Sequence, residues 1–254
     1  MLRLAVIILV LYFDYLLHHR VRPLSNRSSA TVVSIQSLNV VVYIGSMRKS
    51  KARNLLFDLG NVIIDLDVDG AFEKLGKLFR KDVDRKIIDK TLIEYECGRI
   101  TSETFINNLL DQSRLHVQGA EIVDAWNSML VGIPVYRLEM LRMLMNEYNV
   151  YLLSNTNAIH LEWVHQHVKK RHRVDNFEKE HFHQAYYSHL VGDRKPLPSI
   201  FKHIIDDSFM TPGLTLYMDD IKENLDVAKK LGFKTYLVKP GEEIAEYLKV
   251  EGYY

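Results

Sequence analysis

The chain has 254 residues, of which 47% are apolar, enough for one α/β domain with an inserted subdomain or for two small domains. Its 33 basic and 32 acidic residues nearly cancel, and a net charge of +1 gives no electrostatic reason to expect nucleic acid or anionic lipid as a partner. A single cysteine, Cys97, excludes an internal disulfide and suits a reducing compartment, so we expect a cytoplasmic protein.

The first 46 residues differ in composition from the rest. An apolar run over residues 4–13 ends at Asp14, whereas a bilayer span needs about 20 residues. Residues 30–44, rich in Val and Ser, favour extended structure. Two interpretations stay open: an upstream extension outside the working protein, or a weak anchor or export signal. We expect residues 1–46 to be a poorly ordered N-terminal extension without stable membrane insertion.

From Asn54 on, short apolar runs alternate with amphipathic stretches, which is typical of a parallel sheet with crossover helices. Strands are predicted over residues 55–57, 149–153, 184–188, 214–218 and 234–238. Helices are predicted over residues 137–147, 159–169, 198–205, 224–231 and 241–249. The predicted fold class is therefore α/β, with a Rossmann-like parallel sheet core over residues 52–68 and 134–250.

Residues 69–133 lack a strong strand signal and have the pattern of helices. Phe72, Leu75 and Leu78 recur at helical spacing. Thr101 is placed to cap a helix that carries Phe105. We therefore expect a helical subdomain inserted between two strands of the sheet.

Polar side chains directly follow three of the predicted strands. They are Asp58, Ser154 and the pair Asp219-Asp220. Because ligands of open parallel sheets bind beyond the carboxyl ends of the strands, we expect these side chains to converge, with Lys195 adding a positive charge at the same edge. Carboxylates that hold a hard cation such as magnesium, together with a hydroxyl and an ammonium group, suit phosphoryl transfer.

Four segments, in this order, resemble the motifs of haloacid-dehalogenase-like (HAD) phosphatases. They are Phe57-Asp58-Leu59-Gly60-Asn61-Val62-Ile63-Ile64-Asp65, Leu153-Ser154-Asn155-Thr156-Asn157, Arg194-Lys195-Pro196 and Tyr217-Met218-Asp219-Asp220-Ile221-Lys222-Glu223-Asn224. The resemblance covers residues 54–248 and the order is the family's. Within subfamily IA, the chain is similar to bacterial α-D-glucose-1-phosphate phosphatase-like proteins, which share the Asp-x-Gly form of the first motif.

The resemblance implies catalytic roles for four residues. Asp58 would attack phosphorus and form an aspartyl-phosphate intermediate that water then hydrolyses. Ser154 and the backbone N–H of Asn155 would bind phosphoryl oxygens. Lys195 would pair with Asp58 and with the phosphoryl group.

The same resemblance implies a magnesium site. Asp58, the backbone carbonyl of Gly60 and Asp220 would hold the ion. Asn224 would support Asp220, while Asp219 stands where many relatives have glycine.

Gly60 departs from most phosphatases of the family, which have an aspartate there as general acid for the leaving oxygen. Glycine cannot donate that proton, and general acid catalysis typically contributes about 10²- to 10⁴-fold. Three outcomes stay open. Asp65 or Asp67, in the flap that follows Gly60, takes the place of the missing acid. Alternatively, the substrate has a better leaving group, as a sugar 1-phosphate does, or catalysis is weak.

Seven histidines lie between residues 160 and 189. Because neither a cysteine nor a tight His-x₃-His spacing frames them, we expect a solvated polar region there and not a zinc site.

The whole pattern predicts a magnesium-dependent phosphomonoester hydrolase that acts on a small phosphorylated metabolite, with a sugar phosphate favoured. A helical cap over residues 69–133 would close over the substrate. The alternative is a non-catalytic module of the same fold that binds a phosphometabolite or a protein, and Gly60 is the feature in its favour. The sequence specifies neither the oligomeric state nor the identity of the substrate.

Overall fold

The structure is a computed structural model that describes residues 30–35, 40–45 and 52–254. The chain divides into two units, Met1–Lys51 and Ala52–Tyr254. In the first unit, β1 (Ala30–Ile35) and β2 (Val40–Gly45) pair as an antiparallel hairpin, within the stretch expected to favour extended structure. The rest of the predicted extension over residues 1–46 lies outside the described residues. Within the described part of the chain, no helix is long and apolar enough to cross a membrane.

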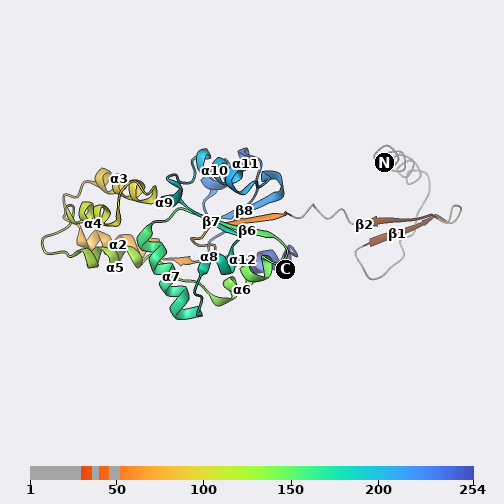
Figure 1. Ribbon diagram of the computed structural model, residues 1–254, viewed down its shortest axis with the longest axis horizontal. Helices are drawn as coiled ribbons and strands as arrows, with labels where there is room; N and C mark the ends of the chain where they lie inside the picture. The colour runs from red at the N-terminus through yellow and green to blue at the C-terminus, as the bar shows by residue number, and fades with distance from the viewer. Residues whose placement is uncertain (1–29, 36–39, 46–51) are drawn as a thin grey trace. The chain divides into compact units, whose positions relative to one another are not determined.

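Five parallel strands form the central sheet of the second unit, in the order β7-β6-β3-β8-β9. Figure 1 shows this sheet with helices on both sides of it. The five strands are β3 (Asn54–Phe57), β6 (Asn149–Ser154), β7 (Gln184–Tyr187), β8 (Thr215–Asp219) and β9 (Lys234–Leu237). The central strand β3 places Phe57 between Leu152 of β6 and Met218 of β8. The carboxyl ends of β3, β6 and β8 therefore meet at one edge, and the predicted α/β fold with a parallel sheet is confirmed.

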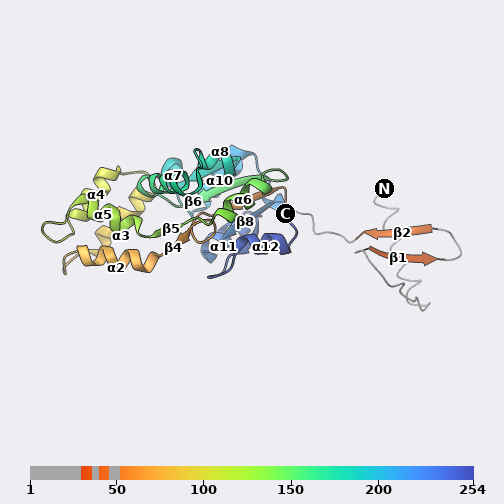
Figure 2. The ribbon, with the colours of Figure 1, turned by 90° about the horizontal axis from the view of Figure 1, so that it is seen from below.

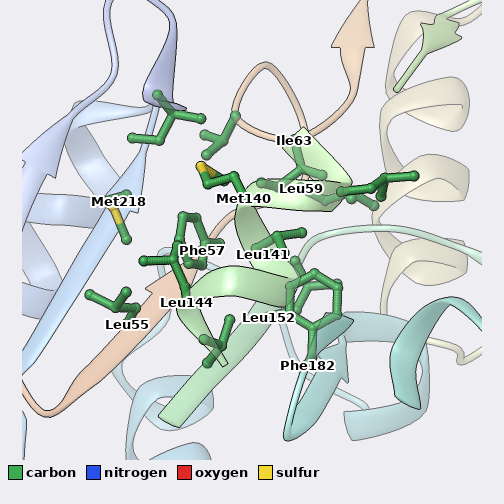
Figure 3. Close-up of a cluster of buried hydrophobic side chains, with 14 of the residues drawn as sticks. Leu55, Phe57, Leu59, Ile63, Met140, Leu141, Leu144, Leu152, Phe182 and Met218 are labelled. Carbon is green, nitrogen blue, oxygen red and sulfur yellow. The ribbon is translucent and has the colours of Figure 1, made fainter. Parts of the chain in front are cut away.

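Alternate residues of the strands face two separate hydrophobic cores. On one face, Leu55 and Phe57 pack with apolar side chains of α6 (Val135–Leu144), α7 (Ala158–His172) and α12 (Ile244–Val250), as Figure 3 shows for part of this cluster. On the other face, Leu56 packs with α10 (Pro198–Ser208) and α11 (Lys222–Lys230). Both faces of the sheet are covered, as parallel sheets require.

Four helices between the first two strands of the sheet form a core of their own, beyond one end of the sheet in both Figure 1 and Figure 2. They are α2 (Val68–Leu78), α3 (Arg85–Glu96), α4 (Ser102–Leu110) and α5 (Gly119–Asn127). At the centre of this core, the rings of Tyr95 and Phe105 stack with centroids 4.2 Å apart. Thr101 caps α4 by accepting from the backbone N–H of Thr104, as the sequence predicts.

Two short strands join the four helices to the sheet domain. β4 (Asp65–Leu66) pairs antiparallel with β5 (Leu130–Gly132). The sequence predicts no strong strand in residues 69–133, but β5 lies within this range. The strand is only three residues long and buries one apolar side chain, so its sequence shows no alternation of apolar and polar residues. Its partner lies more than 60 residues earlier in the chain, so only the tertiary fold creates this pairing.

Helix boundaries differ from the predicted ones by a few residues, and two short helices were not predicted. Pro134 occupies the N-cap position of α6, so this helix begins before residue 137. Asn157 caps α7 by accepting from the N–H of His160. The unpredicted helices are α8 (Phe177–His181) and α9 (Ser188–Val191), each too short to show a helical period in sequence.

Candidate active site

A cavity of about 310 Å³ lies at the carboxyl ends of β3, β6 and β8. It gathers every residue predicted for the site, namely Asp58, Gly60, Ser154, Asn155, Lys195 and Asp220. Asp58 directly follows β3 and Ser154 ends β6, so parallel strands bring together side chains that lie almost 100 residues apart.

Lys195 is buried at the floor of this cavity. Its Nζ lies 2.7 Å from Asp58 Oδ1 and 2.8 Å from Asp219 Oδ2, and it donates to the carbonyl of Leu153 at 3.0 Å. Asn155 fixes the lysine backbone from both sides. Its Oδ1 accepts from the N–H of Lys195, and its Nδ2 donates to the Lys195 carbonyl, both at 2.9 Å. The ammonium group is thereby held against Asp58.

Asp219 is fully buried, and both of its carboxylate oxygens accept hydrogen bonds from the protein. Oδ1 accepts from the backbone N–H of Ile221 at 2.7 Å, and Oδ2 accepts from Lys195 and from the hydroxyl of Tyr217. Asn224 Nδ2 lies 3.0 Å from each oxygen. The sequence assigned Asn224 to the support of Asp220, but the structure places its side-chain amide against Asp219, the last residue of β8.

Asp220 lines the cavity and has a different partner. Asn61 Nδ2 donates to Asp220 Oδ2 at 2.9 Å, while Asn61 Oδ1 accepts from the N–H of Leu66 at 3.2 Å. Asn61 has a positive φ of 52°, a conformation that asparagine adopts more readily than most residues. This side chain links the flap after β3 to the acidic residue after β8.

The three acidic residues at this edge meet the donor requirements of a divalent cation. One carboxylate oxygen each from Asp58, Asp219 and Asp220 lies within 4.8 Å of the others. Among the described residues, Lys195 is the one ammonium group paired with these carboxyl groups, so acidic groups are in excess here, and hard oxygen donors suit magnesium. Because the oxygens of Asp219 already accept protein hydrogen bonds, Asp58 and Asp220 are the better direct ligands.

Burial and neighbouring charges shift the pKa values of the site. Burial raises the pKa of Asp58 to about 7; Lys195 opposes this rise, and Asp219 adds to it. Burial lowers the pKa of Lys195, but Asp219 and Asp58 outweigh it and the net pKa is raised. Burial also raises the pKa of Asp220, against the hydrogen bond from Asn61. Bound cationic charge would favour the ionised carboxylates.

The space next to Gly60 is filled by Leu66. A Cβ placed on Gly60 would lie 2.8 Å from Leu66 Cδ1, so an aspartate there would have to displace the leucine side chain. The two flap residues considered as substitutes for the missing acid do not line the cavity. Asp65 Oδ1 accepts from Arg137 Nη1 at 2.8 Å, and Asp67 Oδ1 caps α2 by accepting from Gly70.

The helices α2, α3 and α5 supply an apolar wall opposite the carboxylates. The wall includes Val68, Phe72, Leu92 and Trp126 of these helices, together with Met129, which follows α5. Glu96, the last residue of α3, adds a carboxyl group to this side of the cavity. Its Oε2 lies 3.0 Å from Arg194 Nη2, next to Lys195 in the chain. The cavity therefore has a charged floor and a largely apolar roof.

His160 contradicts the expectation that the histidines lie in a solvated region. It is 6% exposed, its ring stacks on Trp126 with centroids 4.7 Å apart, and its Nε2 lies 3.2 Å from the carbonyl of Trp126. His181 is likewise buried. The sequence pattern failed here because α7 is covered on one side by α5, a contact between segments about 30 residues apart.

Sequence reasoning missed three residues of this site: Asn61, Glu96 and His160. Asn61 stands inside the first motif, next to Gly60, and its position in a tight loop is a signal for a positive φ. Glu96 and His160 carry no local signal, since each reaches the cavity only through the packing of α2–α5 against the sheet domain.

Comparisons with known proteins agree with this geometry. No protein-family model matches the sequence. A D-ribitol-5-phosphate phosphatase of Bacteroides thetaiotaomicron is 31% identical over 209 residues, covering 78% of this chain and 97% of the relative. A HAD family enzyme of the same organism, solved in complex with magnesium and inorganic phosphate, superposes with a TM-score of 0.69 and 36% identity, covering 77% of this chain and 98% of that one. A HAD-like family hydrolase of Porphyromonas gingivalis gives 0.69 and 28%, covering 79% and 98%.

Proposed function

Because this chain belongs to the HAD family of hydrolases, we propose that it is a magnesium-dependent phosphatase that acts on a small sugar or polyol phosphate through an aspartyl-phosphate on Asp58. The observation that carries the proposal is the position of Lys195 Nζ, 2.7 Å from Asp58 Oδ1. A buried carboxylate with an ammonium group at this distance can approach a phosphate, because the cation offsets the repulsion between two anions.

In this mechanism, an oxygen of Asp58 attacks phosphorus and displaces the alcohol of the substrate. Ser154 Oγ and the backbone N–H of Asn155 bind phosphoryl oxygens. The side chain of Asn155 fixes the backbone of Lys195, which keeps the lysine ammonium group close to the phosphoryl group. Water then hydrolyses the aspartyl-phosphate and releases inorganic phosphate. Asp219 Oδ2 accepts from Lys195 Nζ at 2.8 Å and holds the lysine in place.

The residues that would hold magnesium are Asp58, the carbonyl of Gly60 and Asp220, all of which line the cavity. A bound magnesium ion would neutralise part of the phosphate charge. Asn61 orients Asp220 through its bond of 2.9 Å, so the flap and the acidic residue would move together.

The cavity favours a substrate whose leaving group is uncharged. The basic side chains that line it in the described structure are Arg194 and Lys195, and both are already next to carboxylates. A second phosphate or a carboxylate on the substrate would therefore lack a free cation. The apolar roof formed in part by Phe72 and Trp126 suits the C–H surface of a polyol or sugar, and about 310 Å³ is at the small end for ligand pockets.

Both D-ribitol 5-phosphate and a sugar 1-phosphate fall within this class. The first is supported by the 31% identical relative, which carries that substrate in its name. The second is supported by the resemblance of the first motif to the glucose-1-phosphate phosphatases of subfamily IA. We place D-ribitol 5-phosphate first because the relative matches over 78% of this chain.

We also propose that α2–α5 are the cap domain of this enzyme, inserted over residues 69–133 into a core over residues 52–68 and 134–250. The support is their separate hydrophobic core and the two short strands, β4 and β5, at the junction. The cap would supply the roof of the cavity and exclude water from the reaction.

The proposed function is tested with the 254-residue chain. It is assayed for phosphate release from p-nitrophenyl phosphate, D-ribitol 5-phosphate and glucose 1-phosphate, with magnesium and with a chelator. We expect turnover that requires magnesium and that Asp58→Asn abolishes. Full turnover in Asp58→Asn would disprove the mechanism. Magnesium-dependent binding of phosphate esters without any turnover would favour the non-catalytic alternative.

A further inference from the structure

The absence of an acid at residue 60 leaves the leaving oxygen without an evident proton donor. Among the described residues, six titratable side chains line the cavity. They are Asp58, Glu96, His160, Arg194, Lys195 and Asp220. A replacement for the acid must come from this set or from water, since Asp65 and Asp67 are engaged elsewhere.

Four of the six are already committed. Asp58 is the nucleophile and Asp220 belongs to the proposed magnesium site. Lys195 donates to Asp58, Asp219 and Leu153, which uses its three protons. Arg194 does not lose a proton in proteins.

His160 is in the wrong tautomer to act as the acid. A carbonyl oxygen only accepts, so His160 Nε2 carries the hydrogen that it directs at the Trp126 carbonyl, 3.2 Å away. Burial lowers the pKa of this imidazole to about 4, which leaves Nδ1 without a proton at neutral pH. Nδ1 can accept a hydrogen bond from a substrate hydroxyl but has no proton to give.

Glu96 is the remaining group, and its surroundings suit a proton donor. Its side chain is 23% exposed. Oε2 is buried 3.0 Å from Arg194 Nη2 and has no hydrogen-bond partner among the described residues, which leaves Oε1 to carry the proton. The neighbouring Tyr95 accepts from the backbone N–H of Ile159 at 3.1 Å, which anchors this end of α3 to the sheet domain. The carboxyl group of Glu96 is therefore held in the wall of the cavity, beside Arg194.

We propose that Glu96 is the general acid of this phosphatase, in place of the aspartate that Gly60 lacks. The inference rests on the proposed function. As the bond between phosphorus and the leaving oxygen breaks and the bond to Asp58 forms, the Glu96 carboxyl proton passes to the alcohol oxygen. The Glu96 carboxylate then takes a proton from the water that attacks the aspartyl-phosphate, which restores the starting state.

The charges around Glu96 fit both halves of this cycle. Burial raises the pKa of Glu96, while Arg194 and Lys195 partly oppose the rise. The burial favours the protonated acid before transfer, and the guanidinium of Arg194 stabilises the carboxylate afterwards. An acid whose pKa is moved toward the working pH is the most effective proton donor.

The test compares two esters on Glu96→Gln. The alkoxide of D-ribitol 5-phosphate needs a proton in order to leave, whereas p-nitrophenolate leaves without one. The measured quantity is kcat/KM, because it covers the steps only through formation of the aspartyl-phosphate. We expect the ratio of kcat/KM for the ribitol ester to that for the nitrophenyl ester to fall about 100-fold or more.

The matched control is Glu94→Gln, on the same helix. Glu94 is similarly exposed, at 29%, and pairs with Arg99 at 3.0 Å, but it does not line the cavity. We expect both esters to react at the wild-type rate in this variant. Glu96→Asp retains a carboxyl group and should recover part of the loss for the ribitol ester alone.

Equal losses for the two esters in Glu96→Gln, or no loss for either, would overturn the role of Glu96 while leaving the proposed function intact. A wild-type chain that hydrolyses neither ester in magnesium would instead refute the proposed function, and the inference with it. Thermal unfolding of each variant shows whether a uniform loss comes from misfolding.

Discussion

Lys195 Nζ and Asp219 Oδ2 lie 2.8 Å apart in an ion pair that is almost completely shielded from solvent, with side chains 2% and 0% exposed. Asp219 also accepts from Tyr217 and Asn224, so its carboxylate is satisfied entirely by the protein. Asp219, the last residue of β8, thus supports the lysine, while the next residue, Asp220, lines the cavity.

Asp219→Asn should mainly reduce stability. Breaking a buried ion pair leaves an uncompensated charge, and because Lys195 keeps its second partner, Asp58, we expect a loss of about 3 kcal/mol in the free energy of unfolding. Urea denaturation monitored by circular dichroism measures it. The control is Asp226→Asn, which removes an exposed pair with Lys222 and should leave the midpoint unchanged. Similar losses in the two variants would contradict the structural role assigned to Asp219.

Asn61→Gly should raise the magnesium concentration that the enzyme needs for activity, although the residues that hold magnesium stay the same. Glycine tolerates the positive φ of 52°, so the substitution removes only the side chain that orients Asp220. Loss of such a support typically costs about 10- to 100-fold in metal affinity or activity. Activity is titrated against magnesium concentration, and Asp220→Asn should show the larger defect. A wild-type magnesium titration in Asn61→Gly would show that the bond between Asn61 and Asp220 is dispensable.

His160 should make the protein less stable in mild acid. Its pKa is lowered by burial from 6.5 to about 4, so between these values the unfolded chain binds more protons than the folded one. The stability that this histidine contributes is present above pH 6.5 and is lost as the pH falls toward 4, in total about 3 kcal/mol. Urea denaturation at pH 7 and pH 4.5 measures the difference, which should be smaller in His160→Gln. An equally steep loss in that variant would assign the acid sensitivity to other groups.

Arg137→Met should loosen the start of the flap strand β4. Arg137 Nη1 donates to Asp65 Oδ1 at 2.8 Å and to the carbonyl of Ile63 at 3.2 Å, while Nη2 lies 2.9 Å from Glu243 Oε2. Since these are charge-assisted bonds of a buried guanidinium, we expect a loss of about 2 kcal/mol. Arg142→Met is the control on the same helix; its bond to Glu180 is exposed and should contribute about 0.5 kcal/mol or less. Equal urea midpoints of unfolding for Arg137→Met and Arg142→Met would contradict the role of Arg137 in holding the start of β4.

The amino-acid sequence alone determined the sheet and the positions of the main polar residues. All five predicted strands occur in the structure, and Asp58 and Ser154 stand at strand ends as predicted. This was possible because a buried strand is a local apolar run and because the ends of parallel strands must meet at one edge.

Only the tertiary structure decided which polar groups bind one another. Asn224 binds Asp219 and not Asp220, Asn61 reaches across 159 residues of sequence to Asp220, and His160 is buried under Trp126. These contacts depend on the direction in which each side chain leaves its backbone and on how distant segments pack. The spacing of apolar residues in the sequence shows which side of one helix or strand is buried. It does not show how close two distant segments lie, because that distance is set only when the chain folds.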